Sequence, residues 1–579
     1  MKTKTIHIFD SEEDFFSYSN KSGIDIFLDS EQGREGKENF FIKGQSISQS
    51  DAILEAEKIY SSIQNNIENS IHKIWFRTIE PQVILYIISK IIRNQNVLDR
   101  INDSYPGKKL FFTSNPIIKA LSKEKNTKFK GIGKLYFKEI MIDHFPVIFS
   151  KYRYTKLNNW KHKKINKKIG ESDILIHGEN IVYQKVCNQI TQSLSNAYRV
   201  KTLVSNQKPK EHQFDINSLM NDELYERIND INKDLLEFFD ALSKLLAIQL
   251  KPPTYDLKIF SKLIYKELFN WYSPQLSQSY ILMKNMLKLS TPKIVIINDL
   301  VDIRPRMLAI LSRIMNIKVL YLQFGQQGYY DIQLRGDYAD KYLLWSSSQK
   351  KVFSKFHNIN DSNISIVGSP VISETKNIKT KIKSKVRKKK SIFFPLVPSS
   401  PLTFGNGGMF STFQCRSIFR DLINSVAKNS EHIELIVKPR PLLDNKWANY
   451  FLENEKDKMS IIDHKEPIDS ALNDIDVLVT SHSTVGLDAL NKNIPLIIYD
   501  PFNDPNRNDY ISNKVGFYVS NREELNETFK KIINDEDFLK NLVDLQHLEL
   551  KKMMAFSGFE SHKKVICNIE ESMKEYERK

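Results

Sequence analysis

The chain has 579 residues, of which 41% are hydrophobic and 27% charged, and this composition excludes a wholly disordered protein. Its 85 Lys and Arg against 69 Asp and Glu give a formal net charge of +16, which favours a polyanionic neighbour such as nucleic acid, an anionic membrane face or a phosphate-bearing substrate. No run reaches the ~18 apolar residues of a spanning helix, and no signal-peptide core is present, so we expect a cytoplasmic chain. Three widely spaced cysteines predict neither a disulfide framework nor a zinc site.

The first part of the chain reads as α/β, though irregularly. Helical periodicity is strongest in 52–63, 221–250 and 277–289. Short apolar runs predict strands at 5–9, 24–28, 109–112, 173–177, 293–297 and 318–322.

Segment 374–390 interrupts this pattern with a cation at nearly every second position. Such a run cannot enter a core, so we expect a linker between domains, with a patch for anionic lipid headgroups as the functional alternative. Beyond it, strands at 391–397, 432–437, 459–462, 476–480 and 494–499 alternate with helices. This alternation predicts a parallel sheet covered by helices on both faces, with ligands at the carboxyl ends of the strands.

The most specific segment follows the strand that ends at Thr480. Ser481, Ser483 and Thr484 form a hydroxyl-rich turn, and a helix capped by Ser483 is expected to continue to about Asn493. Free N–H groups beside hydroxyls suit a phosphate, and Asp488, one turn further on, could reach a ribose. The same pattern also fits an ordinary helix start with a surface aspartate.

The pattern Ser-x-Ser-Thr-x-Gly-x-Asp-Ala-Leu, followed by Ile-Pro-Leu-Ile, resembles the nucleotide-binding half of GT-B glycosyltransferases that build bacterial capsule, O-antigen and related surface polysaccharides. The resemblance covers about 292–503, and CDP-glycerol-type polymer transferases share a similar turn. It implies two Rossmann-like domains facing a cleft, and it implies that Ser481, Ser483, Thr484 and Asp488 hold the donor nucleotide. Ser399 and Ser400, which follow the predicted strand at 391–397, are further candidate donor ligands.

Two other motifs extend the resemblance. Lys438 and Arg440 lie in Lys-Pro-Arg-Pro, where relatives carry a His-Pro motif, and could bind a diphosphate by charge although Arg440 replaces the histidine. Gln-Phe-Gly, 323–325, corresponds to a Gln-His-Gly motif with Phe324 in place of histidine. Arg304, Arg306, Gln323 and Gln326 are the candidate acceptor-side residues.

The catalytic base is expected in the first domain, because a transferase needs a group that accepts the proton of the acceptor hydroxyl. Asp299 is the first candidate, since it follows the end of a predicted strand, although it could instead cap the next helix. Asp331 and Glu179 are the second and third candidates. No metal and no cofactor are expected, and the histidines form no zinc motif.

These observations predict a metal-independent GT-B glycosyltransferase that uses a CMP- or UDP-sugar and a growing, lipid-linked surface glycan, at the inner face of the cytoplasmic membrane. The expected parts are an N-terminal Rossmann-like domain with helical insertions (1–373), the basic linker (374–390), the nucleotide-binding domain (391–540) and a helical segment (541–579) that packs back on the first domain. Three alternatives stay open: a CDP-polyol phosphotransferase, a non-catalytic relative and a nucleic-acid-binding protein. The last is disfavoured because no nucleic-acid-binding motif is present.

Overall fold

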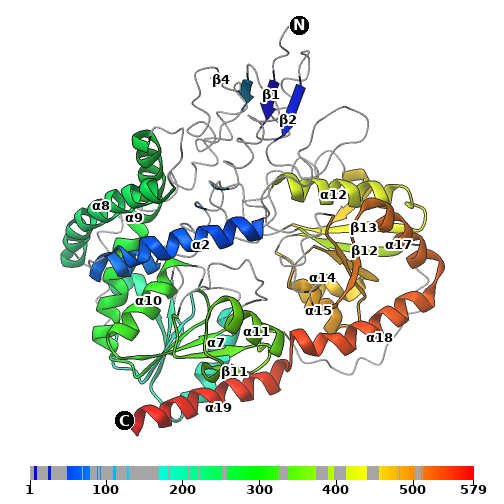
Figure 1. The fold of residues 1–579 in the computed structure, drawn as a ribbon. Helices are drawn as coiled ribbons and strands as arrows, with labels where there is room; N and C mark the ends of the chain where they lie inside the picture. Colours follow the sequence, from blue (N-terminus) through cyan, green and yellow to red (C-terminus); the bar gives the residue numbers. More distant parts are fainter. Residues whose placement is uncertain are drawn as a thin grey trace.

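The structure is a computed structural model, and it is drawn in Figure 1. The residues that it describes are 6–9, 24–27, 49–67, 70–78, 88, 92, 109–112, 127–129, 169–179, 183–205, 209–219, 222–250, 257–300, 302–323, 325, 337–372, 389–396, 412–439, 456–463, 465–481, 483–501, 510 and 513–578.

Two parallel sheets form the main body. The first has seven strands in the order β11-β10-β9-β8-β5-β6-β7. Its strands are β5 (Ile174–His177), β6 (Val200–Val204), β7 (Gln213–Asp215), β8 (Ile294–Ile297), β9 (Lys318–Leu322), β10 (Lys341–Leu344) and β11 (Ile364–Ile366). The strand order reverses between β5 and β8, whose residues Ile174 and Ile294 are paired. This reversal is a topological switch point, where ligands bind in open α/β sheets.

The second sheet has six strands in the order β14-β13-β12-β15-β16-β17. They are β12 (Lys390–Pro395), β13 (Ile433–Lys438), β14 (Met459–Ile461), β15 (Val477–Thr480), β16 (Leu496–Tyr499) and β17 (Phe517–Val519). In chain order this is the 3-2-1-4-5-6 arrangement of the dinucleotide-binding fold, with its switch point between β12 and β15. Two doubly wound domains, each with a switch point, are the GT-B architecture, so the predicted fold class is confirmed.

The strands predicted nearest the N-terminus are present, but they pair only with one another. β1 (Ile6–Phe9), β2 (Ile24–Phe27), β3 (Lys109–Phe112) and β4 (Thr127–Phe129) form a separate parallel sheet in the order β2-β1-β3-β4. Figure 1 shows this small sheet above the two main domains.

Helices cover the sheets and supply much of the first domain's bulk. α8 (Asp222–Leu250) and α9 (Leu257–Ser290) form a long hairpin between β7 and β8, beside α2 (Gln49–Asn65) (Figure 1). Their apolar stripes, including Leu235, Leu242 and Met283, are buried in the core of the first domain. The other helices of the described residues are α7 (Gln184–Leu194), α10 (Ile303–Ile314), α11 (Ser347–Phe356), α12 (Thr412–Ala427), α14 (Ile468–Ala471), α15 (Val485–Asn491), α17 (Arg522–Asn534), α18 (Glu536–Met553) and α19 (Gly558–Glu577).

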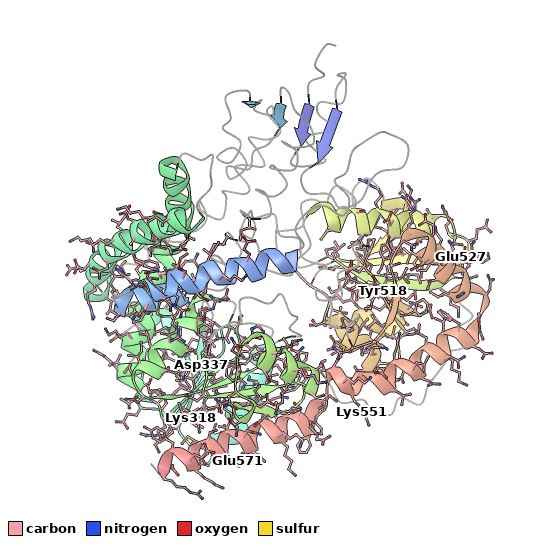
Figure 2. The ribbon with its side chains drawn as sticks, in the orientation of Figure 1. Lys318, Asp337, Tyr518, Glu527, Lys551 and Glu571 are labelled. Carbon is pink, nitrogen blue, oxygen red and sulfur yellow. The ribbon has the colours of Figure 1, made fainter. Side chains whose placement is uncertain are left out.

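The C-terminal helix returns to the first domain. Val565, Ile569 and Met573 of α19 are fully buried in the same core cluster as β5 and β8. On the helix flank, Glu575 binds Lys318 at 2.5 Å and Glu571 lies 3.5 Å from Lys341. Figure 2 shows Lys318 and Glu571 where the first domain meets this helix.

The two chain segments that cross between the domains run side by side. Ser369 N donates to Phe556 O at 2.8 Å, and Gly558 N donates to Ile372 O at 2.9 Å. Gly368, just before the first of these bonds, has φ +79° and lies directly against the Phe556 backbone. Because both crossings are tied together here, they connect the domains as one paired strap.

Candidate functional site

The carboxyl edge of the first sheet carries a row of partly buried charges at its switch point. His177 is the last residue of β5, and Glu179 follows two residues later, with side chains 3% and 10% exposed. His177 Nε2 lies 3.2 Å from Glu179 Oε2, and Arg304 Nη1 of α10 donates to Glu179 Oε1 at 2.5 Å. Glu179 therefore lies between two groups that can carry positive charge.

These contacts shift the pKa values of Glu179 and His177. Burial favours a higher pKa for Glu179, but Arg304 and His177 outweigh it and hold that pKa at about 2. Burial disfavours the charged form of His177, whereas Glu179 raises its pKa above the ordinary value. The ring's Nδ1 lies 3.5 Å from Asn298 Oδ1, so both nitrogens face acceptors, as in an imidazolium. Glu179, the third predicted base, is thus an ion-pair partner with little tendency to accept a proton.

Asp299 and Asp302 form a carboxyl pair beside this row. Asp299 follows β8 and is 5% exposed, whereas Asp302 is exposed and occupies the N-cap position of α10 without a side-chain cap bond. Although Asp302 keeps contact with solvent, the protein around it and then the charge of Asp299 raise its pKa to about 6. A buried carboxyl beside a second carboxyl whose pKa is about 6 is an arrangement suited to general base catalysis.

Two predicted acceptor-side residues are structural instead. Arg306 has no exposed surface, and its guanidinium donates to the carbonyls of Leu300 at 2.6 Å and Thr78 at 2.7 Å. Gln323 is also fully buried, donating to Gly325 O at 2.7 Å and accepting from Trp345 N at 2.7 Å. The prediction that these two side chains face an acceptor is wrong, because both are fully buried and their polar atoms bond to backbone groups and, for Gln323, also to Gln349 Oε1.

The second sheet places the hydroxyl-rich turn at the end of β15. Ser483 N donates to Thr480 Oγ1 at 3.2 Å, and Ser483 Oγ accepts from Val485 N at 3.4 Å. Ser481 is fully buried, whereas Thr484 is exposed. Two details correct the prediction: the N-cap residue of α15 is Thr484, not Ser483, and the helix has only 7 residues. So short a helix has a small dipole, and anion binding here depends mainly on the turn's own N–H and hydroxyl groups.

Asp488 lies in the first turn of α15, close to Asp469 and Lys492. Burial, followed by the charge of Asp469, raises its pKa to about 7, and the attraction of Lys492 only partly offsets this rise. Lys492 Nζ itself donates to Asp469 O at 2.6 Å and to Asn473 Oδ1 at 3.3 Å. Ionising Asp488 in the folded protein therefore costs free energy. Asp488 is the residue that the sequence predicts to contact a ribose.

We expect Asp488→Asn to stabilise the protein at pH 8. The native pKa of about 7 exceeds the unfolded value, so the folded state holds a proton that the unfolded state has lost, and stability falls as pH rises from about 4 to 7. The neutral amide removes this cost, a gain of about 4 kcal/mol at pH 8 that shrinks toward zero at pH 4. Urea unfolding at several pH values measures it, and an equal gain at pH 4 and pH 8 would contradict the assigned cause.

Lys438 ends β13, two strands away from β15 in the sheet. Its Nζ donates to Asp463 O at 3.0 Å, on the side of β14. Burial lowers the pKa of this ammonium, although the charges of Glu466 and Asp463 partly counter that effect. Lys438 thus lies at the predicted edge of the sheet but is bonded away from the turn.

A loop at the edge of the first sheet approaches the hydroxyl-rich turn of the second. A Cβ placed on Gly325 would lie 3.9 Å from Thr484 Cγ2, so the Gln-Phe-Gly motif of the first domain approaches the hydroxyl-rich turn of the second. Gln323 holds the Gly325 carbonyl in place. The carboxyl pair and the turn therefore belong to domains that approach each other through these two motifs.

Several predicted residues lie outside the part of the chain that the structure describes. They are Asp331, Gln326, Phe324, Ser399, Ser400, Arg440 and nearly all of the basic linker 374–390.

Sequence reasoning did not identify His177, Asn298 or Asp302. Each lies at or just beyond the carboxyl end of a buried strand, and that position is the signal that could have found them. What the sequence lacks is the strand order, which places β5 beside β8 and so brings His177 to Asn298.

Among the described residues, no three His, Cys, Asp or Glu side chains lie where they could hold a metal ion together. Within that part of the chain, too, no helix combines the length and the apolar character that crossing a bilayer requires.

Residues 325–570 match the family model of CDP-glycerol:poly(glycerophosphate) glycerophosphotransferase. This part of the chain, which is less than half of its length, resembles that transferase domain. It includes Gly325, the hydroxyl-rich turn and most of α19. The resemblance to GT-B enzymes related to CDP-glycerol polymer transferases is thereby confirmed, and the protein is a transferase.

No curated protein matches the chain. Among solved structures, MnaA of S. aureus with UDP has 12% identity and a TM-score of 0.43, covering 69% of this chain and 96% of its own. A putative UDP-N-acetylglucosamine 2-epimerase from Listeria monocytogenes has 9% identity and a TM-score of 0.44, covering 70% and 98%. A variant of the wall teichoic acid polymerase TagF, soaked with CDPG, has 9% identity and a TM-score of 0.39, covering 77% and 99%. The assignment of the fold rests on the strand orders given above.

Proposed function

We propose that this transferase moves a sugar from a CMP- or UDP-linked donor to a hydroxyl of a growing bacterial surface polysaccharide. The observation that carries the proposal is the approach of Gly325 to Thr484, which brings a domain with a carboxyl pair against a domain with a hydroxyl-rich turn. One domain can activate an acceptor hydroxyl, and the other can bind the phosphates of a nucleotide.

In the proposed reaction, the acceptor oxygen bonds to the anomeric carbon while the bond from that carbon to the donor phosphate oxygen breaks. Asp299 accepts the proton of the acceptor hydroxyl, and Asp302 beside it adds negative charge that favours this transfer. The nucleotide leaves with its phosphate at the turn of Ser483 and Thr484. Lys438 would exchange its bond to the Asp463 carbonyl for the departing phosphate, and Arg440 would add a second cation.

The second candidate is transfer of a polyol phosphate from a CDP-activated donor into a teichoic-acid-like polymer, and the family match favours it. Both reactions use a pyrimidine nucleotide as leaving group and a hydroxyl as acceptor. They differ in the atom attacked, which is carbon for the sugar and phosphorus for the polyol phosphate. A donor panel therefore separates them by the product formed.

The acceptor and the location belong to the same proposal. A lipid-linked glycan would hold the enzyme at the inner face of the cytoplasmic membrane, and the net charge of +16 favours an anionic surface. No nucleic-acid partner is proposed.

We expect CMP, CDP or UDP to raise the melting temperature of the protein, and Lys438→Ala and Ser483→Ala each to weaken that effect. A ligand at about 100 times its Kd adds about 2.7 kcal/mol of stability when it binds only the folded state. Thermal unfolding with a panel of nucleotides measures the shift. Lys530→Ala, which removes an exposed cation of the same domain that pairs with Glu527, is the matched control.

The nucleotide panel tests the donor site, and turnover assays test catalysis. A pyrimidine shift that is lost in Lys438→Ala but kept in Lys530→Ala supports the donor site. Unfolding of both site variants with binding intact would contradict the site, and binding without turnover of any sugar or polyol donor would favour the non-catalytic alternative.

A further inference from the structure

The most exposed large apolar side chains of the described residues gather around the junction of α18 and α19. Leu548 and Leu545 of α18 are 73% and 63% exposed, and Phe559 in the first turn of α19 is 71% exposed. Every other large apolar side chain among the described residues is less exposed than these three. Val371, whose strap segment is bonded to the start of α19, is 37% exposed beside them. We call these four residues the junction patch.

The patch is not the packing face of either helix. Leu542, Gln546 and Leu550 form the buried face of α18, and Gln546 exchanges two hydrogen bonds with Leu496 of β16. Leu545 and Leu548 lie outside this buried face, as their exposure shows. Figure 1 shows α18 and α19 along one outer border of the molecule. Their exposure is therefore a property of the outer surface, and apolar side chains gathered in this way mark an interaction site.

Cations surround the patch on the same border. Lys551 and Lys552 lie in the last turn of α18, and Lys563 lies one turn beyond Phe559. Lys551 and Lys563 have no ion-pair partner among the residues described, and Figure 2 shows Lys551 near the junction. The acids are arranged differently: Glu571, Glu575 and Glu577 of α19 pair with lysines of the first domain, and Glu549 pairs with Lys552. Asp544 and Glu560 are the exposed acids that remain nearby.

We propose that the junction patch docks on an anionic lipid bilayer, with Leu545, Leu548 and Phe559 entering the interfacial layer and Lys551 and Lys563 contacting lipid phosphates. Apolar anchors flanked by ammonium groups are the combination that binds peripheral proteins to anionic membranes. The inference rests on the proposed function, because an enzyme that extends a lipid-linked acceptor needs access to the membrane surface. It names the surface used, which lies outside the site residues.

A second copy of this chain fits the patch less well. In a two-fold symmetric contact, the same surface meets itself, so Lys551 and Lys563 of one copy would approach those of the other. Like charges brought together oppose such pairing, whereas lipid phosphates would neutralise them.

The test uses the full chain and vesicles that contain phosphatidylglycerol or only phosphatidylcholine. The patch variant carries Leu545→Ser, Leu548→Ser and Phe559→Ser; its matched control carries Leu236→Ser and Ile248→Ser, two exposed apolar residues of α8. We expect co-sedimentation with phosphatidylglycerol vesicles to weaken at least tenfold in the patch variant and to stay unchanged in the control. A second variant, Lys551→Glu with Lys563→Glu, is expected to lose binding to the same vesicles without altering the apolar anchors.

Several outcomes would overturn the proposal. The patch and charge variants would bind phosphatidylglycerol vesicles as well as the parent does, or the α8 control would lose as much binding as the patch variant. Equal binding to phosphatidylglycerol and phosphatidylcholine vesicles would also contradict the proposal. Light scattering without vesicles tests the second-copy occupant, since a dimer that the patch variant dissociates would replace the membrane as the explanation. Transfer to a water-soluble acceptor is assayed in parallel. Retained transfer with lost vesicle binding supports the docking surface, whereas absent transfer with intact vesicle binding defeats only the proposed function.

Discussion

Replacing Asp299 by Asn is expected to lower kcat by about 10² to 10⁴, because a positioned general base contributes on that scale. The amide is nearly isosteric and cannot accept the proton, so substrate binding is expected to change little and the loss to fall on kcat rather than KM. Asp299 is 5% exposed and lies next to Asp302, whose pKa it helps to raise to about 6. Steady-state kinetics with the donor identified by the thermal panel measure both constants.

Asp302→Asn is the control, because it removes the neighbouring carboxyl and leaves Asp299. In the wild-type protein, activity is expected to fall as pH drops through about 6, where Asp302 takes up a proton. The Asp302→Asn variant is expected to keep measurable activity and to lose this acidic limb. If Asp299→Asn keeps more than a tenth of wild-type kcat while Asp302→Asn is inactive, the exposed carboxyl is the base and our assignment is reversed.

Gly368→Ala is expected to destabilise the protein by about 3 to 5 kcal/mol, among the largest effects of a single substitution. Gly368 has φ +79°, where residues with a Cβ are strained. An added Cβ would lie 2.2 Å from Phe556 O and 2.6 Å from Phe556 C, both backbone atoms that no side-chain rotation can move. Relief of the clash must separate the paired crossings and break the bond from Ser369 N to Phe556 O.

Gly170→Ala is the matched control, since nothing lies within 4 Å of a Cβ placed there. Urea unfolding compares the two variants with the parent at one pH and temperature. Similar midpoints for Gly368→Ala and Gly170→Ala would show that the crossings separate at little cost, which would contradict the paired strap.

Local patterns predicted most of the secondary structure. The strands at 173–177, 293–297, 318–322 and 476–480 are present within a residue or two, because three or four consecutive apolar residues bounded by polar ones leave a buried parallel strand as the simplest arrangement. Likewise, the helix after the hydroxyl-rich turn ends at Asn491, two residues before Asn493, which has φ +61° and is the predicted stop. Such features depend on residues a few positions apart, so they can be inferred from the sequence.

Side-chain roles that depend on distant partners could not be inferred in the same way. The sequence pattern assigns Arg306 to the acceptor side, yet its guanidinium is committed to Thr78 O, 228 positions away. The pattern assigns Gln323 there as well, yet this side chain supports Trp345 and Gly325. The sequence shows that a polar residue follows a strand, but only the packed neighbours decide whether it faces a ligand or satisfies a buried carbonyl.

The amino-acid sequence alone thus determined the alternation of strands and helices, the excess of positive charge and the polar motifs at strand ends, since each follows from local periodicity and composition. The order of the strands was decided only by the tertiary structure. That order places His177 beside Asn298, leaves Glu179 in an ion pair with Arg304, and brings Gly325 to Thr484 across 159 residues of chain. Contacts at such separations depend on how whole sheets assemble and pack, and no short window of sequence contains them.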